Sequence, residues 1–356
     1  MTDSDSTRHT GDGTSDAPAP SEAEHAARGT TAPPADGEQP ARGNAIPWLP
    51  IQHLDHLWFQ VAGTLCNFTC HHCFISCSPK NDSFGFLSLA QIRTYLEESI
   101  GLGVKEYYFT GGEPFLNPEM VAILLETLRF GPATVLTNAS VLKEDWLSKL
   151  AEGERESGYS LEFRVSLDGF TAETNDPIRG AGTFDRTVRG IERLVAHGFL
   201  PIITAARTWK WEEEQRVVGA FVEMLRGIGY GRPRLKILPT LHLGAEEERS
   251  RGYLPDERVS ADMLVDYDTS QLLCSHSRIV TDRGVHVCPI LIEAPESRLA
   301  EKSLAEAMVP FALEQGACST CYEFGAICSN STSPGSRPEK GRGKEEEEKG
   351  RIGKRE

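Results

Sequence analysis

Several features of common protein classes are missing from this 356-residue chain. No apolar run approaches the roughly 20 residues that a membrane-spanning helix needs. The first residues lack the basic start and apolar core of a secretory signal, so we expect a cytoplasmic protein. A basic surface is also missing, because the net charge is −15. That charge argues against binding to nucleic acid or to an anionic membrane.

Large apolar side chains are scarce at both ends of the chain. Residues 1–45 are rich in Ser, Thr, Pro, Ala, Gly and Asp, and residues 332–356 are charged and of low complexity. Such segments cannot bury enough apolar surface to offset the entropy lost on ordering. We therefore expect a disordered N-terminal tail over 1–45, a disordered charged tail over 332–356, and folded structure between them.

Cysteine is the residue type whose placement is most informative. In a cytoplasmic protein the nine cysteines should stay reduced, and an odd number cannot pair completely. One group lies in "GTLCNFTCHHCFISC" at 63–77, and the other lies between residues 274 and 328. Clustered, reduced cysteines indicate metal-binding or catalytic sites rather than disulfides.

Strand and helix signals alternate through the middle of the chain. Buried-strand patterns occur at 55–63, 105–110, 133–138, 161–167, 200–207 and 233–239, and helical patterns at 88–100, from 117 onward, and at 144–151, 184–197 and 212–227. Six strand–helix repeats predict an α/β fold, with helices outside a parallel sheet that is either open or curled toward a barrel. We expect residues 46–240 to form this core.

Polar residues and glycines follow the predicted strands. The first cysteine group follows the first strand, and "GGEP" (111–114) follows the second. Asn138 ends the third strand, and Ser166 and Asp168 end the fourth. Because the carboxyl ends of parallel strands share one edge, these residues should lie together on the rim where such folds place reactive groups.

The spacing of the first cysteines indicates an inorganic cluster. Cys66, Cys70 and Cys73 form a C-x3-C-x2-C pattern. Three thiolates on one loop can bind one face of an iron–sulfur cubane and leave the fourth iron open. Zinc prefers a closed tetrahedral site, which Cys77 could complete, although four such dense cysteines do not match the usual pairs of zinc ligands. Otherwise Cys77 is a small buried or loop thiol.

The cysteine spacing, followed one strand later by Gly-Gly-Glu-Pro, resembles the radical S-adenosylmethionine (SAM) superfamily. The resemblance continues through "TNAS" (137–140), "VSLDG" (165–169) and "IRGAGTFDRTVRGI" (178–191), and it covers about residues 55–240. It implies a partial (β/α)6 TIM-like barrel with a [4Fe–4S] cluster on Cys66, Cys70 and Cys73. SAM would bind the open iron through its amino and carboxylate groups. Its reductive cleavage would give a 5′-deoxyadenosyl radical that abstracts hydrogen from a substrate.

The resemblance also implies contacts to SAM. The residues concerned are Gly111, Gly112 and Glu113 near the methionyl amino group, Ser166 and Asp168 at the ribose or carboxylate, Arg179 at the carboxylate, and Asn138. The sequence departs from the family's pattern at two positions. His72 replaces an aromatic or apolar residue before the third cysteine, and Ala139 replaces the glycine that often follows the asparagine.

Simpler interpretations of these residues remain open. The two glycines of Gly-Gly-Glu-Pro, and Asp168 before Gly169, could be turn residues. Arg179 could pair with Asp176. His71 and His72 could be exposed loop histidines.

The second cysteine group lies in a differently patterned region. Its members are Cys274, Cys288, Cys318, Cys321 and Cys328. A hairpin pattern at 277–288 and a helical pattern at 303–315 accompany them. The group resembles the C-terminal modules of SPASM/twitch radical SAM enzymes, which implies one auxiliary [4Fe–4S] cluster in a cysteine-rich α+β module over 241–331. A structural zinc at the C-x2-C pair is the alternative.

SPASM/twitch enzymes often act on peptides, proteins or cofactor precursors. The resemblance therefore implies a substrate of that kind, and a flavodoxin- or ferredoxin-type reductant. A non-catalytic iron–sulfur protein for electron transfer or redox sensing is the competing class, and a zinc-bound scaffold is a third. The competing class needs the cysteines but not Gly-Gly-Glu-Pro, Ser166 or Arg179.

Overall fold

The computed structural model describes residues 45–325 and 327–328. The tails expected at 1–45 and 332–356 lie outside the described residues, apart from Ala45. No helix in the described part is both long and apolar enough to cross a membrane.

A sheet in the strand order β10-β9-β8-β2-β3-β4-β5-β6-β7 organises this part of the chain. Its members are β2 (His56–Gln60), β3 (Glu106–Thr110), β4 (Ala133–Thr137), β5 (Leu161–Ser166), β6 (Ile202–Ala206), β7 (Arg234–Leu238), β8 (Ser277–Thr281), β9 (Gly284–His286) and β10 (Arg298–Ala300). Strands β2 to β7 pair in parallel and in chain order. The described strands do not close into a full barrel, so the predicted partial barrel is confirmed.

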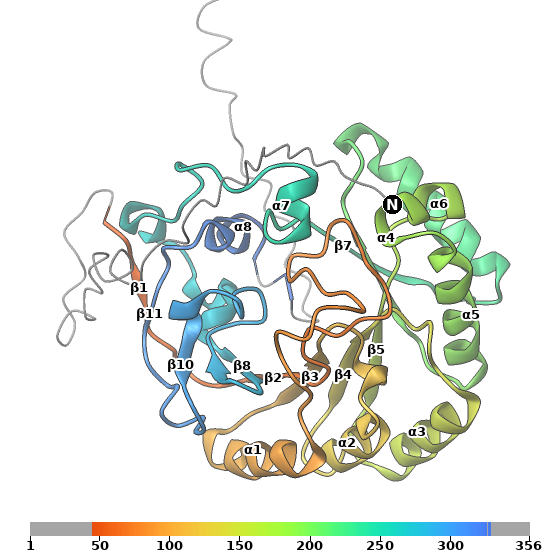
Figure 1. Ribbon diagram of the computed structural model, residues 1–356, viewed down its shortest axis with the longest axis horizontal. Helices are drawn as coiled ribbons and strands as arrows, with labels where there is room; N and C mark the ends of the chain where they lie inside the picture. Colours follow the sequence, from red (N-terminus) through yellow and green to blue (C-terminus); the bar gives the residue numbers. More distant parts are fainter. Residues whose placement is uncertain (1–44, 326, 329–356) are drawn as a thin grey trace, which may run out of the picture. The chain divides into compact units, whose positions relative to one another are not determined.

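Helices connect the parallel strands. They are α1 (Leu89–Leu102), α2 (Met120–Thr127), α3 (Glu144–Glu156), α4 (Ala172–Arg179), α5 (Thr183–Ala196) and α6 (Glu214–Gly227). In Figure 1, α1, α2, α3 and α5 run along the outer side of the strands. A capping box between Ser88 and Gln91 begins α1, as the sequence predicts. Helix α4 was not predicted, because it is polar and contains Pro177.

The two faces of the parallel strands have different surroundings. Alternate positions such as Leu57, Phe59, Phe109, Val135, Phe163 and Ile203 pack with the helices in one apolar core. The intervening positions of β5 and β6 carry Arg164, Ser166 and Thr204, which line a cavity. Because side chains alternate along a strand, one face stabilises the fold while the other builds a site.

The C-terminal region extends the same sheet. The predicted hairpin is confirmed as β8 and β9, which pair antiparallel. Strand β8 also pairs in parallel with β2, beside the first cysteine loop. Figure 1 shows β8 beside β2, with β10 further from β2 on the same side. The boundary expected between a core at 46–240 and a module at 241–331 therefore crosses one continuous sheet.

The prediction of a helix over residues 303–315 is wrong. This segment contains turns and β11 (Phe311–Ala312), which pairs antiparallel with β1 (Trp48–Leu49); the helix α8 (Gly316–Phe324) begins only afterwards. Pro310 disfavours a helical conformation in the residue before it. In addition, the buried guanidinium of Arg278 donates to the carbonyls of Ala307 and Val309, at 2.8 and 2.9 Å. The region also contains the short helix α7 (Ala245–Arg249).

Candidate functional site

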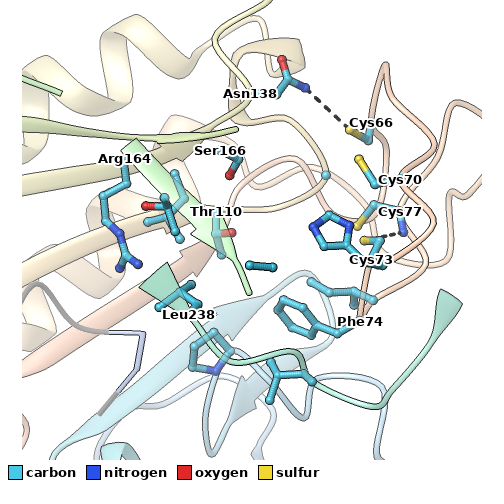
Figure 2. A pocket seen from close by; sticks show the side chains of 18 of the residues that line it. Cys66, Cys70, Cys73, Phe74, Cys77, Thr110, Asn138, Arg164, Ser166 and Leu238 are labelled. Carbon is cyan, nitrogen blue, oxygen red and sulfur yellow. Dashed lines mark hydrogen bonds between the residues drawn. The ribbon is translucent and has the colours of Figure 1, made fainter. Parts of the chain in front are cut away.

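The inner face of the parallel strands opens into a cavity of about 230 Å³. Its wall includes residues from each strand from β2 to β7, from the first cysteine loop and from the C-terminal region. The residues predicted to bind the first cluster or SAM that lie on this wall are Cys66, Cys70, Cys73, Gly111, Gly112, Asn138, Ser166 and Arg179. Figure 2 shows Cys66, Cys70, Cys73 and Cys77 together on one side. The prediction that the strand ends share one rim is confirmed, since β2 to β5 run parallel.

Two of the predicted ligand sulfurs receive N–H donors from the chain. The backbone N–H of Phe68 lies 3.4 Å from Cys66 Sγ, and the Asn138 side-chain amide lies 3.9 Å from it. Arg179 Nη1 lies 3.9 Å from Cys70 Sγ. Burial raises the pKa of Cys66 to about 12 and that of Cys70 to about 11. Donors of this kind stabilise sulfur ligands, but a cation is needed to hold both residues as thiolates.

The third predicted ligand sulfur, that of Cys73, accepts hydrogen bonds from both the backbone and the side chain of Cys77. The backbone N–H of Cys77 lies 3.3 Å from Cys73 Sγ. The Cys77 thiol contact, opposed by burial, lowers the pKa of Cys73 to about 6. The Cys77 sulfur lies 4.0 Å from the carbonyl oxygen of Gly111, and its own pKa is raised by its hydrogen bond to Cys73. These contacts suit a thiolate at Cys73 and a neutral thiol at Cys77, so the donor set fits a ligand triplet followed by a supporting cysteine.

A single metal ion is a different case from a cluster. Among the described residues, no group of three or more His, Cys, Asp or Glu side chains is close enough to hold one ion. A cubane spreads its thiolates over separate irons, so this finding concerns sites for single ions only.

The two glycines of Gly-Gly-Glu-Pro let the backbone approach the cysteine loop. Gly111 has a φ of +151°, and a Cβ there would lie 2.9 Å from the backbone nitrogen of Ala62. A Cβ on Gly112 would collide with the carbonyl oxygen of Leu65, immediately before the first cysteine. Both positions therefore require glycine because the backbone packs closely here, in addition to lying on the cavity wall.

Glu113 lies behind the cavity rather than on its wall. Its side chain is fully buried and accepts hydrogen bonds from the Thr137 hydroxyl at 2.7 Å and the Asn138 backbone N–H at 2.7 Å. The backbone N–H of Phe115 donates to it at 3.1 Å. Burial raises the pKa of Glu113 to about 7, against the effect of these donors. Its contacts join the segment after β3 to the end of β4 and so hold Asn138 beside Cys66.

Asp168 also lies behind the wall, where it positions two residues that reach the cavity. Its Oδ2 is 2.5 Å from Arg179 Nε and 2.9 Å from His72 Nε2, and its Oδ1 accepts the backbone N–H of Ala206 at 2.6 Å. Asp176 instead accepts the backbone N–H of Phe184 at the start of α5, so pairing of Arg179 with Asp176 is wrong.

Several residues on the wall were not expected from the sequence. His72 is largely buried and lines the cavity, so the exposed-loop interpretation is wrong for this residue, whereas His71 is exposed. Cys77 and Cys328 also line the cavity, as does Arg164 within β5. A charged residue in the middle of the buried pattern "LEFRVSL" is the signal that could have identified Arg164.

A second, smaller pocket of about 20 Å³ lies in the C-terminal region. Cys274, Cys288, Cys318 and Cys321 line it, and its other lining residues are Leu, Val, Ile, Phe and Ala. The fifth cysteine of this group, Cys328, lies on the wall of the large cavity instead. Burial raises the pKa of Cys321 well above its usual range, and Cys328 is the cysteine that adds most to this effect. Four sulfurs around a dry, apolar pocket fit a soft cluster, which would supply the positive charge that the thiolates need.

Comparison with known proteins agrees with this geometry. Residues 61–213 match the model of the radical SAM superfamily. Mycofactocin maturase MftC of Mycobacterium ulcerans (strain Agy99) is 34% identical over 135 residues, which cover 38% of this chain and 35% of that protein. The subtilosin biosynthesis protein AlbA of Bacillus subtilis (strain 168) is 30% identical over 135 residues, covering 37% of this chain and 29% of that protein. The chain thus spans about a third of the length of these curated relatives.

The fold also resembles solved structures. Streptococcus suis SuiB bound to S-adenosylmethionine superposes with a TM-score of 0.55 at 16% identity, covering 76% of this chain and 68% of that chain. At this identity the likeness concerns the fold, and it extends beyond the parallel strands into the C-terminal region. The family match covers the first cysteine loop, Gly-Gly-Glu-Pro and strands β3 to β6. Residues 61–213 of this chain are therefore a domain of the radical SAM superfamily.

Proposed function

We propose that this chain is a radical SAM enzyme. The observation that carries the proposal is the placement of Cys66, Cys70 and Cys73 on one side of a cavity whose wall also includes Gly111 and Gly112. When bound there, a [4Fe–4S] cluster with an open iron supplies the electron that cleaves SAM to methionine and a 5′-deoxyadenosyl radical. We expect a flavodoxin- or ferredoxin-type protein to provide that electron.

The chain's own residues would bind and shield the cluster and SAM. Cys66, Cys70 and Cys73 would hold the cluster, and their N–H donors would stabilise the sulfurs. Arg179 is already paired with Asp168, so its guanidinium is held in place beside Cys70. A fixed cation at this point would attract the SAM carboxylate without needing to reorganise.

The inner face would contribute further contacts to SAM. Asn138 and Ser166 lie on the cavity wall and offer neutral polar groups. The remaining wall is largely apolar, with Trp58, Phe68, Ile75 and Leu136 among its residues. An apolar enclosure excludes water, and exclusion of water protects a reactive radical from side reactions.

A second cluster is proposed in the small cysteine-lined pocket. Cys274, Cys288, Cys318 and Cys321 would be its ligands, since all four line the pocket. Four protein ligands complete a cubane. A structural zinc is the competing occupant, and metal analysis distinguishes the two.

The substrate is proposed to be a peptide or a cofactor precursor. MftC is named as a maturase, and SuiB has been solved bound to a precursor peptide, SuiA. We also propose a cytoplasmic location, where the nine cysteines, all free in this structure, would stay reduced.

Anaerobic reconstitution tests the proposed function. The reduced protein should form 5′-deoxyadenosine from SAM and contain about eight irons, as two cubanes require. Cys70→Ala should form none. Cys77→Ser is the matched control, since position 77 lies on the same loop and a serine hydroxyl can replace the thiol that donates to Cys73. This variant should retain activity. Equal 5′-deoxyadenosine from Cys70→Ala and wild type, or none from wild type, would make the proposal wrong.

A further inference from the structure

A buried arginine faces the cavity on the side opposite the cysteine loop. Arg164 lies within β5 and is 1% exposed, yet it lines the cavity wall. Figure 2 shows its side chain across the cavity from Cys66, Cys70 and Cys73. Side chains alternate along a strand, so Arg164 lies on the same face as Ser166, further from the rim.

The charge of Arg164 lacks a carboxylate counterpart within the described part of the chain. Arg179, which lines the cavity beside Cys70, lies 2.5 Å from Asp168. By contrast, no described Asp or Glu lies within ion-pair distance of Arg164. Among the residues that the structure describes, those that line the cavity include no Asp and no Glu. A guanidinium buried without an anion is strongly unfavourable, so such a group usually binds one.

The hydrogen bonds of Arg164 leave part of its guanidinium available. Nη1 donates to the carbonyl oxygen of Cys328. The buried Nε has no hydrogen-bond acceptor among the described residues. Because the guanidinium is planar, its Nε edge can present two parallel N–H groups to one ligand.

A second cation lies on the same face of the sheet. Lys236 of β7 is in register with Thr204 of β6, which lines the cavity. Burial, and then the charge of Arg164, lower the pKa of Lys236 to about 8. The two basic groups therefore interact, and an anion bound near them would stabilise both charges.

We propose that Arg164 binds a carboxylate group of the substrate, so that the substrate lies between this arginine and the cysteine loop. The planar, two-point edge of a guanidinium matches a carboxylate, and the apolar wall around it strengthens the interaction. The SAM carboxylate would lie at the cluster on the opposite side, so Arg164 is left for a second molecule. This inference deepens the proposed function and rests on it for the identity of the ligand as substrate.

Calorimetry on the reconstituted, SAM-loaded, unreduced enzyme tests this site. The probes are N-acetyl-alanine and its uncharged amide. Wild type should bind the carboxylate at least about tenfold more tightly than the amide, since hydrogen bonds to charged groups are the stronger ones. Arg164→Gln should bring this ratio close to one without changing the affinity for SAM. Arg234→Gln is the matched control, because Arg234 pairs with Glu162 at 2.6 Å and does not line the cavity.

Other outcomes would overturn the assignment. An unchanged ratio of carboxylate to amide affinity in Arg164→Gln would show that Arg164 does not bind the carboxylate. A tenfold loss of SAM affinity would show that Arg164 binds SAM instead. Tighter binding of inorganic phosphate than of N-acetyl-alanine would replace the carboxylate by a phosphate. If Arg164→Gln does not fold, Arg164→Lys should lower the ratio at least threefold, because one ammonium lacks the two-point edge; an unchanged ratio would again contradict the site. A wild type that shows the ratio but cleaves no SAM would refute the proposed function and leave the carboxylate site intact.

Discussion

Asp168 and Arg179 form a buried ion pair in which Oδ2 lies 2.5 Å from Nε. Asp168 follows β5, and Arg179 is the last residue of α4. The same carboxylate lies 2.9 Å from Nε2 of His72, on the first cysteine loop. One carboxylate thus joins three segments around the cavity, and it holds the cation that lies beside Cys70.

Replacing this carboxylate should be costly. Asp168→Asn keeps the shape but leaves the Arg179 charge buried without its anion, so we expect a loss of about 3 kcal/mol or more in the free energy of unfolding. Denaturant titration measures this. Glu213→Gln breaks the surface pair with Arg216, at 2.8 Å, and serves as the control that leaves the midpoint unchanged.

The destabilisation caused by Asp168→Asn should depend on pH in a defined direction. Burial raises the pKa of Asp168, but the charges of Arg179 and His72 outweigh burial and hold it well below its usual range. A carboxylate with a lowered folded-state pKa stabilises the protein above its unfolded pKa, about 4, and this contribution is lost as the pH falls toward the folded value. The difference between wild type and variant should be constant from about pH 8 to 5 and shrink below about pH 4. A difference that grows with acid would contradict the ion pair.

The ion pair between Asp168 and Arg179 illustrates which features of the site can be predicted from the sequence and which cannot. Asp168 and Arg179 were both identified, and the rim was predicted, because parallel strands bring their carboxyl ends together whatever their length. Which carboxylate pairs with the arginine was not predictable, since Asp176 is nearer along the chain and only the turn after β5 brings Asp168 into contact. The pairing of β8 with β2 was likewise missed, because it joins residues about 220 apart and leaves no local pattern. The sequence predicts Arg164 only as part of a buried strand, because its role depends on which face of the strand is covered by helices.

Single substitutions distinguish the cysteines that bind the second cluster from a cysteine that only lies near it. Cys321→Ser should remove about four of the eight irons expected of two cubanes, because Cys321 lines the small pocket. Cys328→Ser should retain all eight, because Cys328 lines the large cavity. Iron and zinc analysis of anaerobically purified protein measures both. Loss of four irons from Cys328→Ser would show that Cys328 is a cluster ligand. Zinc in place of iron would show that the site holds a structural zinc and not a cluster.

Gly112 gives a test of how the first loop is held. A methyl group at this position would meet the Leu65 carbonyl, which is backbone and cannot rotate away. Gly112→Ala should therefore displace the loop, lower the iron content of the first site and destabilise the chain by more than about 2 kcal/mol. Gly101→Ala is the control, since Gly101 lies in α1 with open space around it; it should be neutral or stabilise by about 0.5–1 kcal/mol. Full iron content in Gly112→Ala would show that the loop can adjust.

Arg278 should be the main stabilising contact of the segment that was wrongly expected to be helical. Its guanidinium is fully buried and donates to four carbonyl groups, those of Cys274, Ser277, Ala307 and Val309, at 2.7 to 2.9 Å. Arg278→Met removes every donor while keeping an apolar side chain of similar reach, so we expect a loss of at least about 3 kcal/mol in the free energy of unfolding from buried carbonyls left without partners. Arg298→Met, at an exposed position, should change it by less than about 0.5 kcal/mol. Limited proteolysis should show earlier cleavage near residues 303–310 in Arg278→Met than in wild type. Unchanged stability and cleavage would mean that β11 and α8 hold this segment without the arginine.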